Sequence, residues 1–254
     1  MKKLQLPLAI LITCSFHLSA QSRLRENNAI VWLNSFGTFH LTPKWSLHAE
    51  GQWRRADGVK NAQQELFRTG INYKCNDQLT ARIGAAFIET HPYSFTPINS
   101  MGRPFSEYRT YEMLLLHQPV QKFRLTHRFM LEQRWIGKYS SESILHEDLF
   151  TYLNRGRYML RLQSPEKKMK EKTMGLYGVL QGEIFVGFGK NVGENVFDQN
   201  RFALLLGLKL NKQLSLEGGF FSQMLQLPRE VQGKNLIQYN RGASINLYYT
   251  GIFY

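Results

Sequence analysis

The sequence has only two cysteines among its 254 residues, Cys14 and Cys75. Cys14 lies in an apolar N-terminal stretch that we expect to be removed, so only Cys75 would remain and no internal disulfide could form. After that stretch, no apolar run approaches the roughly 18 residues that a membrane-spanning helix needs. These absences exclude a small disulfide-held scaffold and a helical membrane protein.

The N-terminus has the three parts of a secretory signal peptide. Lys2 and Lys3 form a basic start, residues 4–16 are almost entirely apolar, and Leu18-Ser19-Ala20 ends the run with small residues. This pattern predicts a signal peptide of residues 1–20, followed by a single domain of residues 21–254. A lipoprotein anchored at Cys14 is the alternative, but Thr13 is a poor residue immediately before a lipidated cysteine.

Acidic residues are scarce relative to basic ones. The chain has 19 Asp and Glu against 32 Lys and Arg, which gives a formal net charge of +13. This excess favours anionic partners such as lipopolysaccharide phosphates or small anionic solutes. Nucleic acid is not an expected partner, because the chain is predicted to be exported and has no recognisable nucleic-acid-binding motif.

What the sequence has in abundance is period-two alternation, most clearly in residues 122–135. One parity of this segment is apolar: Phe123, Leu125, Phe129 and Leu131. The other parity is polar or charged: Arg124, Thr126, Arg128, Glu132 and Arg134. Successive side chains of a strand point to opposite faces, so this strand has one apolar and one ionic face. His127 is the exception, because it lies on the apolar parity.

Similar segments recur along the whole chain. We count eleven strands, at residues 30–41, 45–54, 66–74, 79–87, 109–117, 122–135, 152–162, 176–186, 202–210, 214–224 and 239–253. Single-chain bacterial barrels have even strand numbers. Either residues 22–28 add a strand, giving twelve, or one segment is not a strand, giving ten. The sequence therefore predicts an all-β, antiparallel up-and-down transmembrane β-barrel of about 12 strands with a polar, charged lumen.

The connections alternate between short and long. Short ones fall at residues 42–44, 75–78, 118–121 and 211–213, and long ones at 55–63, 90–105, 137–149, 187–199 and 226–236. Outer-membrane barrels have short periplasmic turns and long outer loops, so the pattern predicts the outer membrane. The long connection at 163–173 departs from it. The alternative is a soluble periplasmic β-barrel or sandwich that binds a ligand.

The polar parity of these strands predicts a lumen charge network. Its members are Glu50, Arg54, Arg82, Glu112, Arg124, Arg128, Glu132, Arg134, Arg155, Arg157, Arg161, Glu183, Arg201 and Glu217. Arginine binds carboxylates through two parallel hydrogen bonds, so these residues are expected to cross-link neighbouring strands. Because arginines outnumber carboxylates, a passage or pocket that prefers anions is the functional interpretation.

Catalytic and metal-binding motifs are missing. The chain has no His-x-Ser, no Gly-x-Ser-x-Gly, no HExxH and no paired-cysteine metal site. A lipase-like or deacylase-like enzyme at the outer rim remains an alternative, and its candidates are His91 with Ser94 and Ser143 with His146. We expect both pairs to be ordinary loop residues. No cofactor or metal is expected, and Asp198-Gln199-Asn200 lacks the ligand spacing of a calcium loop.

Several motifs together resemble one family of uncharacterised Bacteroidetes proteins, the domain of unknown function DUF2490. They are Trp32, Pro43-Lys44-Trp45-Ser46-Leu47, His127-Arg128-Phe129 with Glu132-Gln133-Arg134, Arg155 with Arg157, Glu183 with Phe185, and Phe197-Asp198-Gln199-Asn200-Arg201. The resemblance covers nearly all of the chain after residue 20. It implies an outer-membrane β-barrel and supplies no activity.

The sequence thus predicts a non-enzymatic outer-membrane channel or structural barrel with an arginine-rich lumen. Its expected partners are outer-membrane lipids and lipopolysaccharide, the barrel assembly machinery and small anionic solutes.

Overall fold

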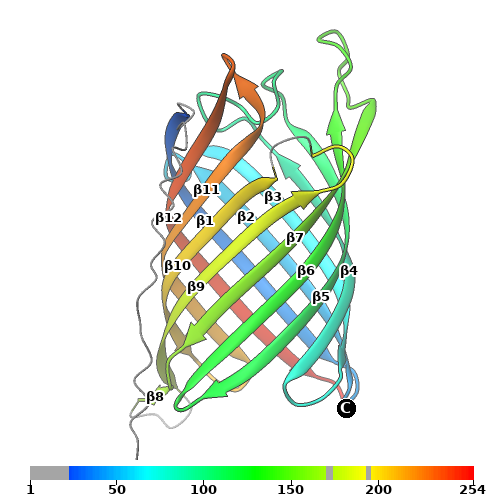
Figure 1. Cartoon of the computed structure of the whole chain (residues 1–254). Helices are drawn as coiled ribbons and strands as arrows, with labels where there is room; N and C mark the ends of the chain where they lie inside the picture. The colour runs from blue at the N-terminus through cyan, green and yellow to red at the C-terminus, as the bar shows by residue number, and fades with distance from the viewer. Residues whose placement is uncertain (1–22, 170–173, 193–195) are drawn as a thin grey trace, which may run out of the picture.

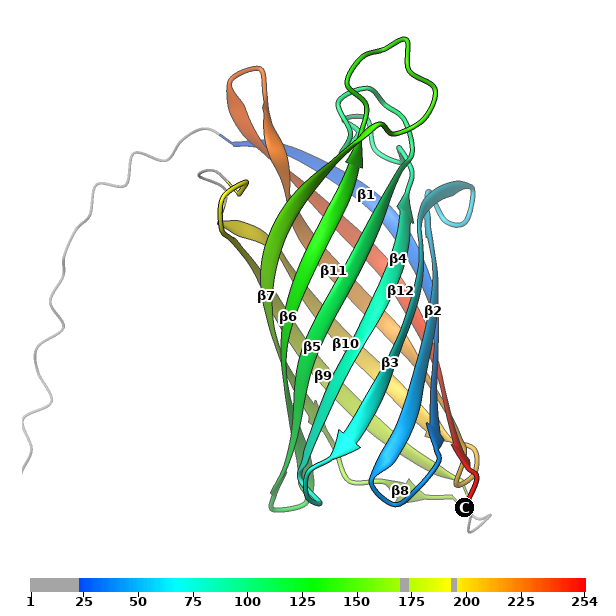
Figure 2. The same cartoon turned by 90° about the vertical axis from the view of Figure 1, so that its right-hand side faces the viewer.

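The computed structural model of the chain describes residues 23–169, 174–192 and 196–254. The predicted signal peptide, with Cys14, lies outside the described residues. Among the residues described, none forms a helix long and apolar enough to cross a membrane. The structure is all-β, and its strands close into a tall barrel (Figures 1 and 2).

Twelve strands are present in the described chain. They are β1 (Leu24–His40), β2 (Trp45–Ala56), β3 (Asn61–Lys74), β4 (Leu79–Thr90), β5 (Phe105–Val120), β6 (Phe123–Lys138), β7 (Leu149–Gln163), β8 (Lys167–Lys168), β9 (Gly175–Phe188), β10 (Phe197–Lys209), β11 (Leu214–Val231) and β12 (Lys234–Ile252). All except β8 belong to the barrel wall, whose order follows the chain and closes between β12 and β1. The two-residue β8 pairs only with one end of β9.

The closing seam differs from the rest of the wall. β1 runs parallel to β12, from Leu24 opposite Leu236 to His40 opposite Ile252, whereas the other wall pairs are antiparallel. The all-β barrel is confirmed, but its wall is not antiparallel throughout. Residues 24–28 begin β1 and add no separate strand. The wall thus has eleven strands, and an odd number makes the first and last strands point the same way.

The connections sort onto the two ends of the barrel as predicted. The short turns lie together at one end, here called the turn end, and the long loops at the other, the loop end (Figure 1). Asn76 and Asn211 stabilise two turns, because each side-chain oxygen accepts hydrogen bonds from two following backbone N–H groups at 2.8–2.9 Å. The exceptional connection after β7, which carries β8, lies at the turn end (Figure 2).

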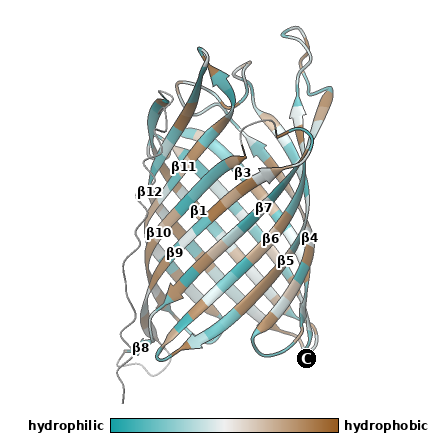
Figure 3. Ribbon diagram, viewed as in Figure 1, coloured by the Kyte–Doolittle hydropathy of each residue, from teal (hydrophilic) through white to brown (hydrophobic). Residues whose placement is uncertain are grey.

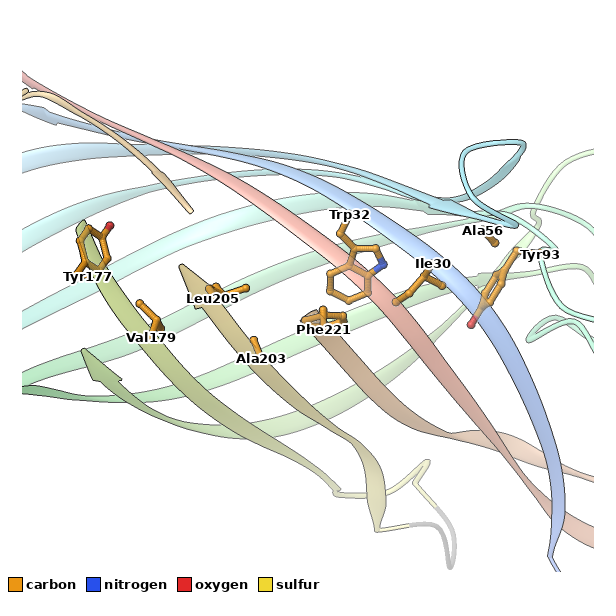
Figure 4. Close-up of a cluster of buried hydrophobic side chains, with 9 residues drawn as sticks. All are labelled: Ile30, Trp32, Ala56, Tyr93, Tyr177, Val179, Ala203, Leu205 and Phe221. Carbon is orange, nitrogen blue, oxygen red and sulfur yellow. The ribbon is translucent and has the colours of Figure 1, made fainter. Parts of the chain in front are cut away.

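Side chains alternate between the lumen and the outer surface along each strand. Hydropathy alternates visibly along the ribbons (Figure 3). Outward residues are exposed and largely apolar, such as Leu204 and Leu206 in β10. Inward residues are mostly polar and charged, with three apolar clusters among them. The largest comes from both sides of the seam: Ile30, Trp32, Ala56, Tyr93, Tyr177, Val179, Ala203, Leu205 and Phe221 (Figure 4).

Tyr111 fills the lumen beside glycines of β3 and β4. It is almost fully buried, and its hydroxyl donates a 3.0 Å hydrogen bond to the Thr69 carbonyl oxygen. A Cβ at Gly84 would lie 2.6 Å from the Tyr111 hydroxyl oxygen and closer still to that carbonyl. Gly84→Val should therefore lower the free energy of unfolding by about 1–3 kcal/mol through overpacking. Urea unfolding measures this, with Gly182→Val, where a Cβ meets no atom within 4 Å, as the control.

Candidate functional site

Glu132 of β6 is the centre of the charged lumen. Its side chain is fully buried, and two arginines of β7 bind it. Arg155 Nε and Nη2 donate to Glu132 Oε2 at 2.8 and 2.6 Å, and Arg157 Nη1 donates to Oε1 at 2.7 Å. Arg68 and Arg109 each bring a terminal nitrogen to 3.6 Å from Oε1. One carboxylate therefore holds the guanidinium groups of strands β3, β5 and β7 together.

The network extends from Glu132 toward the loop end. Arg109 Nε and Nη2 donate to Glu107 at 2.5 and 2.9 Å, and Arg134 binds the same carboxylate. Arg155 Nη1 donates to Asp198 Oδ2 at 2.5 Å. Asp198 reaches the lumen because the β9–β10 register shifts there, so that Asp198 has no partner in β9. This β-bulge turns a side chain inward that strict alternation would place outside.

Two further carboxylates hold the network on the other side of Glu132. Arg157 Nε and Nη2 donate to Glu183 Oε1 at 3.0 and 2.8 Å, and Arg128 Nη2 donates to the same atom at 2.8 Å. Arg68 Nη1 donates to both oxygens of Glu50, at 3.0 and 3.1 Å. Ion pairs thus connect strands β2, β3, β5, β6, β7, β9 and β10 across the lumen.

Glu217 of β11 forms a smaller, separate cluster nearer the turn end. Arg161 binds it through both terminal nitrogens. The hydroxyls of Tyr177 and Tyr248 donate to it at 2.9 and 3.1 Å. This cluster joins β7, β9 and β12 to β11.

The central network divides the lumen into two chambers. The loop-end chamber has a volume of about 210 Å³ and the turn-end chamber one of about 420 Å³. Four residues line both: Gln52, Arg68, Arg157 and Arg201. These four residues, with Glu132 buried among them, are the partition. The ion pairs of Arg68 and Arg157 with Glu132, together with the bulk of the four side chains, separate the chambers.

The loop between β4 and β5, residues 91–104, covers the loop-end chamber. Tyr93 is buried in it and donates a 2.8 Å hydrogen bond to Gln238 of β12. Gln238 Nε2 in turn donates to the Thr96 carbonyl at 2.7 Å, and Arg229 donates to the Pro97 carbonyl at 3.0 Å. These contacts hold the loop against β11 and β12, so the loop reaches across the lumen from β4 and β5, the two strands that it connects.

Two arginines of the loop-end chamber face the indole of Trp32 in β1. The guanidinium carbons of Arg54 and Arg201 lie 3.8 and 4.9 Å from the ring centroid. Arg201 also lies 4.6 Å from the Phe185 ring centroid. Phe221 also packs against Trp32, with the two ring centroids 4.2 Å apart.

The structure brings nearly all of the predicted lumen residues together. Those in contact with the network or lining a chamber are Glu50, Arg54, Arg82, Arg124, Arg128, Glu132, Arg134, Arg155, Arg157, Arg161, Glu183, Arg201 and Glu217. Arg124 lines the turn-end chamber but is itself exposed near its mouth. In the motif of residues 198–201, Gln199 accepts a 3.2 Å hydrogen bond from Arg201, and Asn200 points outward and is exposed.

Glu112 is the one residue placed on the wrong face. It is exposed on the outer surface of β5 and accepts a 3.0 Å hydrogen bond from Gln133. Residues 113–116 are apolar on both parities, so alternation cannot assign the faces there. The signal lay earlier in the strand, where Glu107 and Arg109 share the inward parity with Tyr111. Arg68 was also missed, although it lies within the predicted strand of residues 66–74, on the parity opposite Phe67 and Ile71.

The candidate catalytic pairs do not form. His91 Nε2 lies 2.6 Å from Glu65 Oε2, whereas the Ser94 hydroxyl donates to Glu26 Oε2 at 2.6 Å. The Ser143 hydroxyl lies 2.8 Å from that of Ser141 rather than against His146. The described ranges hold no group of three or more His, Cys, Asp or Glu side chains placed to bind a metal.

His127, the exception on the apolar parity, has a partner on the outer surface. Its Nδ1 lies 2.8 Å from the Tyr158 hydroxyl on the neighbouring strand β7. His127 therefore has a hydrogen-bond partner on the outer surface, and its position needs no β-bulge in β6.

The family comparison covers most of the barrel. A family model described as "Protein of unknown function (DUF2490)" matches residues 29–234, which includes every residue of the central network. Searches of curated proteins and of solved structures found no match.

Proposed function

Because the chain belongs to the DUF2490 family, whose description assigns no activity, we propose a function from the structure: a non-enzymatic outer-membrane β-barrel whose partitioned, arginine-rich lumen admits small anions. The observation that carries the membrane location is the outer surface. Large apolar side chains are exposed on strand after strand around the barrel, including Ile71, Ile83, Leu114, Leu204 and Leu206. A protein in water seldom exposes so much contiguous apolar surface.

Aromatic pairs near both ends of the wall support this location. At the turn end, Trp45 packs on Tyr73 and Phe39 on Tyr249, with ring centroids 4.7 and 5.9 Å apart. At the loop end, the pairs are Phe87 with Tyr108 at 5.3 Å and Trp135 with Tyr152 at 5.3 Å. Two aromatic girdles that flank an apolar band are typical of transmembrane barrels.

The lumen favours selective binding or slow passage over an open pore. The partition and the loop of residues 91–104 both obstruct it, and its ion pairs fix the obstructing side chains in place. Arginines outnumber carboxylates in the lumen, so the lumen keeps an excess of positive charge even where ion pairs form. Small anions are therefore the solutes that this lumen suits.

Membrane fractionation tests the location. The protein should sediment with the outer membrane, need detergent for extraction, and migrate faster on a gel unboiled than boiled, because a folded barrel resists the detergent at room temperature. A protein that stays soluble without detergent would refute the proposal. Conductance in planar bilayers tests the lumen: the wild type should show at most small currents, with anions carrying most of them.

A further inference from the structure

Two arginines of the loop-end chamber, the buried Arg54 and the partly buried Arg201, have no carboxylate of the described chain within ion-pair distance. Within the described residues, neither Arg54 nor Arg201 forms an ion pair within 4.0 Å. The carboxylates of the central network are already engaged by other arginines, as Glu183 is by Arg128 and Arg157. Glu183 lies opposite Arg201 in the β9–β10 register but does not come within ion-pair distance of it. Both charges therefore add to the positive potential of the chamber.

Arg54 is hydrogen-bonded to two glutamines, but no carboxylate of the described residues neutralises its charge. Its Nε donates to Gln52 Oε1 at 2.9 Å, its Nη2 donates to the same oxygen, and its Nη1 donates to Gln64 Oε1. These are amide oxygens without formal charge. The side chain is only 5% exposed, and burying a charge without an opposite one is costly.

Of the two arginines, Arg201 has more N–H donors that are available to a ligand. Its Nε donates to Gln199 Oε1 at 3.2 Å, and in the described part of the chain Nη1 and Nη2 have no hydrogen-bond acceptor. Trp32 and Phe185 lie against the guanidinium plane and fix its orientation. A fixed planar guanidinium with free terminal nitrogens matches the geometry of a carboxylate.

Part of the lining of this chamber is apolar. Ile98 and Phe105 come from the covering loop and the start of β5, and Leu66, Ile136, Leu153 and Leu227 line other sides of the same chamber. An inorganic anion would leave these surfaces unused. A carboxylate with a compact apolar body would satisfy Arg201 and bury its body against them.

We propose that the loop-end chamber is a binding site for a small organic carboxylate, whose carboxylate binds the Arg201 guanidinium, with Arg54 adding positive charge, and whose apolar body contacts the walls under the loop of residues 91–104. This deepens the proposed function, since it names the class of anion that the lumen takes. It does not depend on the membrane location, because the chamber belongs to the folded barrel itself.

Calorimetric titration of the full-length protein in detergent micelles tests the site with benzoate as the probe. Benzamide has the same size and no charge, and sulfate is an anion with no apolar body. Benzoate should bind saturably, and benzamide and sulfate at least about tenfold more weakly, the loss expected for a charge-assisted hydrogen-bonded pair. Equal binding of benzamide would refute the role of charge, and equal binding of sulfate would refute an organic ligand.

Variants locate the binding. Arg201→Gln should reduce benzoate affinity to the level of benzamide, and Arg54→Gln should reduce it less. Arg124→Gln, which removes the same charge from the turn-end chamber, should leave it unchanged. The faster migration of unboiled protein verifies that each variant folds, and Arg201→Lys, which keeps the charge without the planar fork, should bind benzoate at intermediate strength if Arg201→Gln does not fold.

No binding of benzoate by the wild type, or the same affinity in Arg201→Gln and Arg124→Gln, would overturn the site. Either result would leave the outer-membrane proposal standing if the protein fractionates as expected. Conversely, a soluble protein that binds benzoate through Arg201 would refute the location and keep the site.

Discussion

Replacing Glu132 with alanine should lower the free energy of unfolding by about 3–5 kcal/mol, because it removes the negative charge that four buried arginines share. Four guanidinium groups surround this carboxylate, two of them in hydrogen-bond contact. Arg157 keeps Glu183 and Arg155 keeps Asp198, but their mutual repulsion would no longer be screened. Urea unfolding of the folded barrel, followed by gel mobility, measures the change.

Glu112→Ala is the matched control for this experiment. Glu112 is the same residue type in the adjacent strand, directly beside Gln133, but it is exposed on the outer surface. Its replacement should not destabilise the barrel by more than about 0.5 kcal/mol. In the proposed membrane it should be neutral or stabilising, because a charged side chain on the lipid face is itself destabilising. A loss at Glu112 equal to that at Glu132 would contradict a central role for the buried network.

Replacing Glu132, Arg68 and Arg157 together with alanine should open the partition. Both arginines pair with Glu132, and the other carboxylates of the network keep a partner when all three are removed. Glu107 keeps Arg109 and Arg134, Glu183 keeps Arg128, Asp198 keeps Arg155 and Glu50 keeps His48. The two chambers would then join. Conductance in planar bilayers should rise from at most small currents to clear single-channel steps.

The same triple variant should also be more stable than Glu132→Ala alone. Residues that share one ionic network have non-additive effects, and removing two arginines with the carboxylate leaves less excess positive charge in the lumen than removing the carboxylate alone. Arg161→Ala, which alters the turn-end cluster and not the partition, is the control for conductance. Clear channel steps in Arg161→Ala, or none in the triple variant, would show that the partition does not close the lumen.

Much of this architecture follows from alternation alone. Every predicted strand overlaps a wall strand, and the two faces of β6 were assigned correctly because its charged residues all fall on one parity, although Met130 and Ile136 also lie on that face. The faces of β5 were assigned wrongly at Glu112, since residues 113–116 are apolar on both parities and only Glu107 and Arg109, earlier in the strand, mark the inward face. Alternation gives no information where both faces carry the same kind of side chain.

The sequence predicts which charged residues face the lumen, but it does not predict how they pair. Which arginine binds which carboxylate depends on the stagger between strands, and that stagger is fixed by closure of the whole barrel. The pairing of Arg155 with Asp198 depends further on one β-bulge. The free donors of Arg201 follow from the same distribution of partners, so they were not foreseeable from its position in the sequence.

If the barrel lies in a membrane, as we propose, the parallel seam determines how its strands cross. Taken from the C-terminus, the wall divides into five hairpins whose tips lie at the loop end, and β1 is left over as a single strand. If the loop end faces the outside, each hairpin crosses as a closed tip, whereas β1 must carry a free chain end through the bilayer before it meets β12. A tag placed just before Leu24 would then be displayed at the cell surface, and one after Tyr254 would stay in the periplasm.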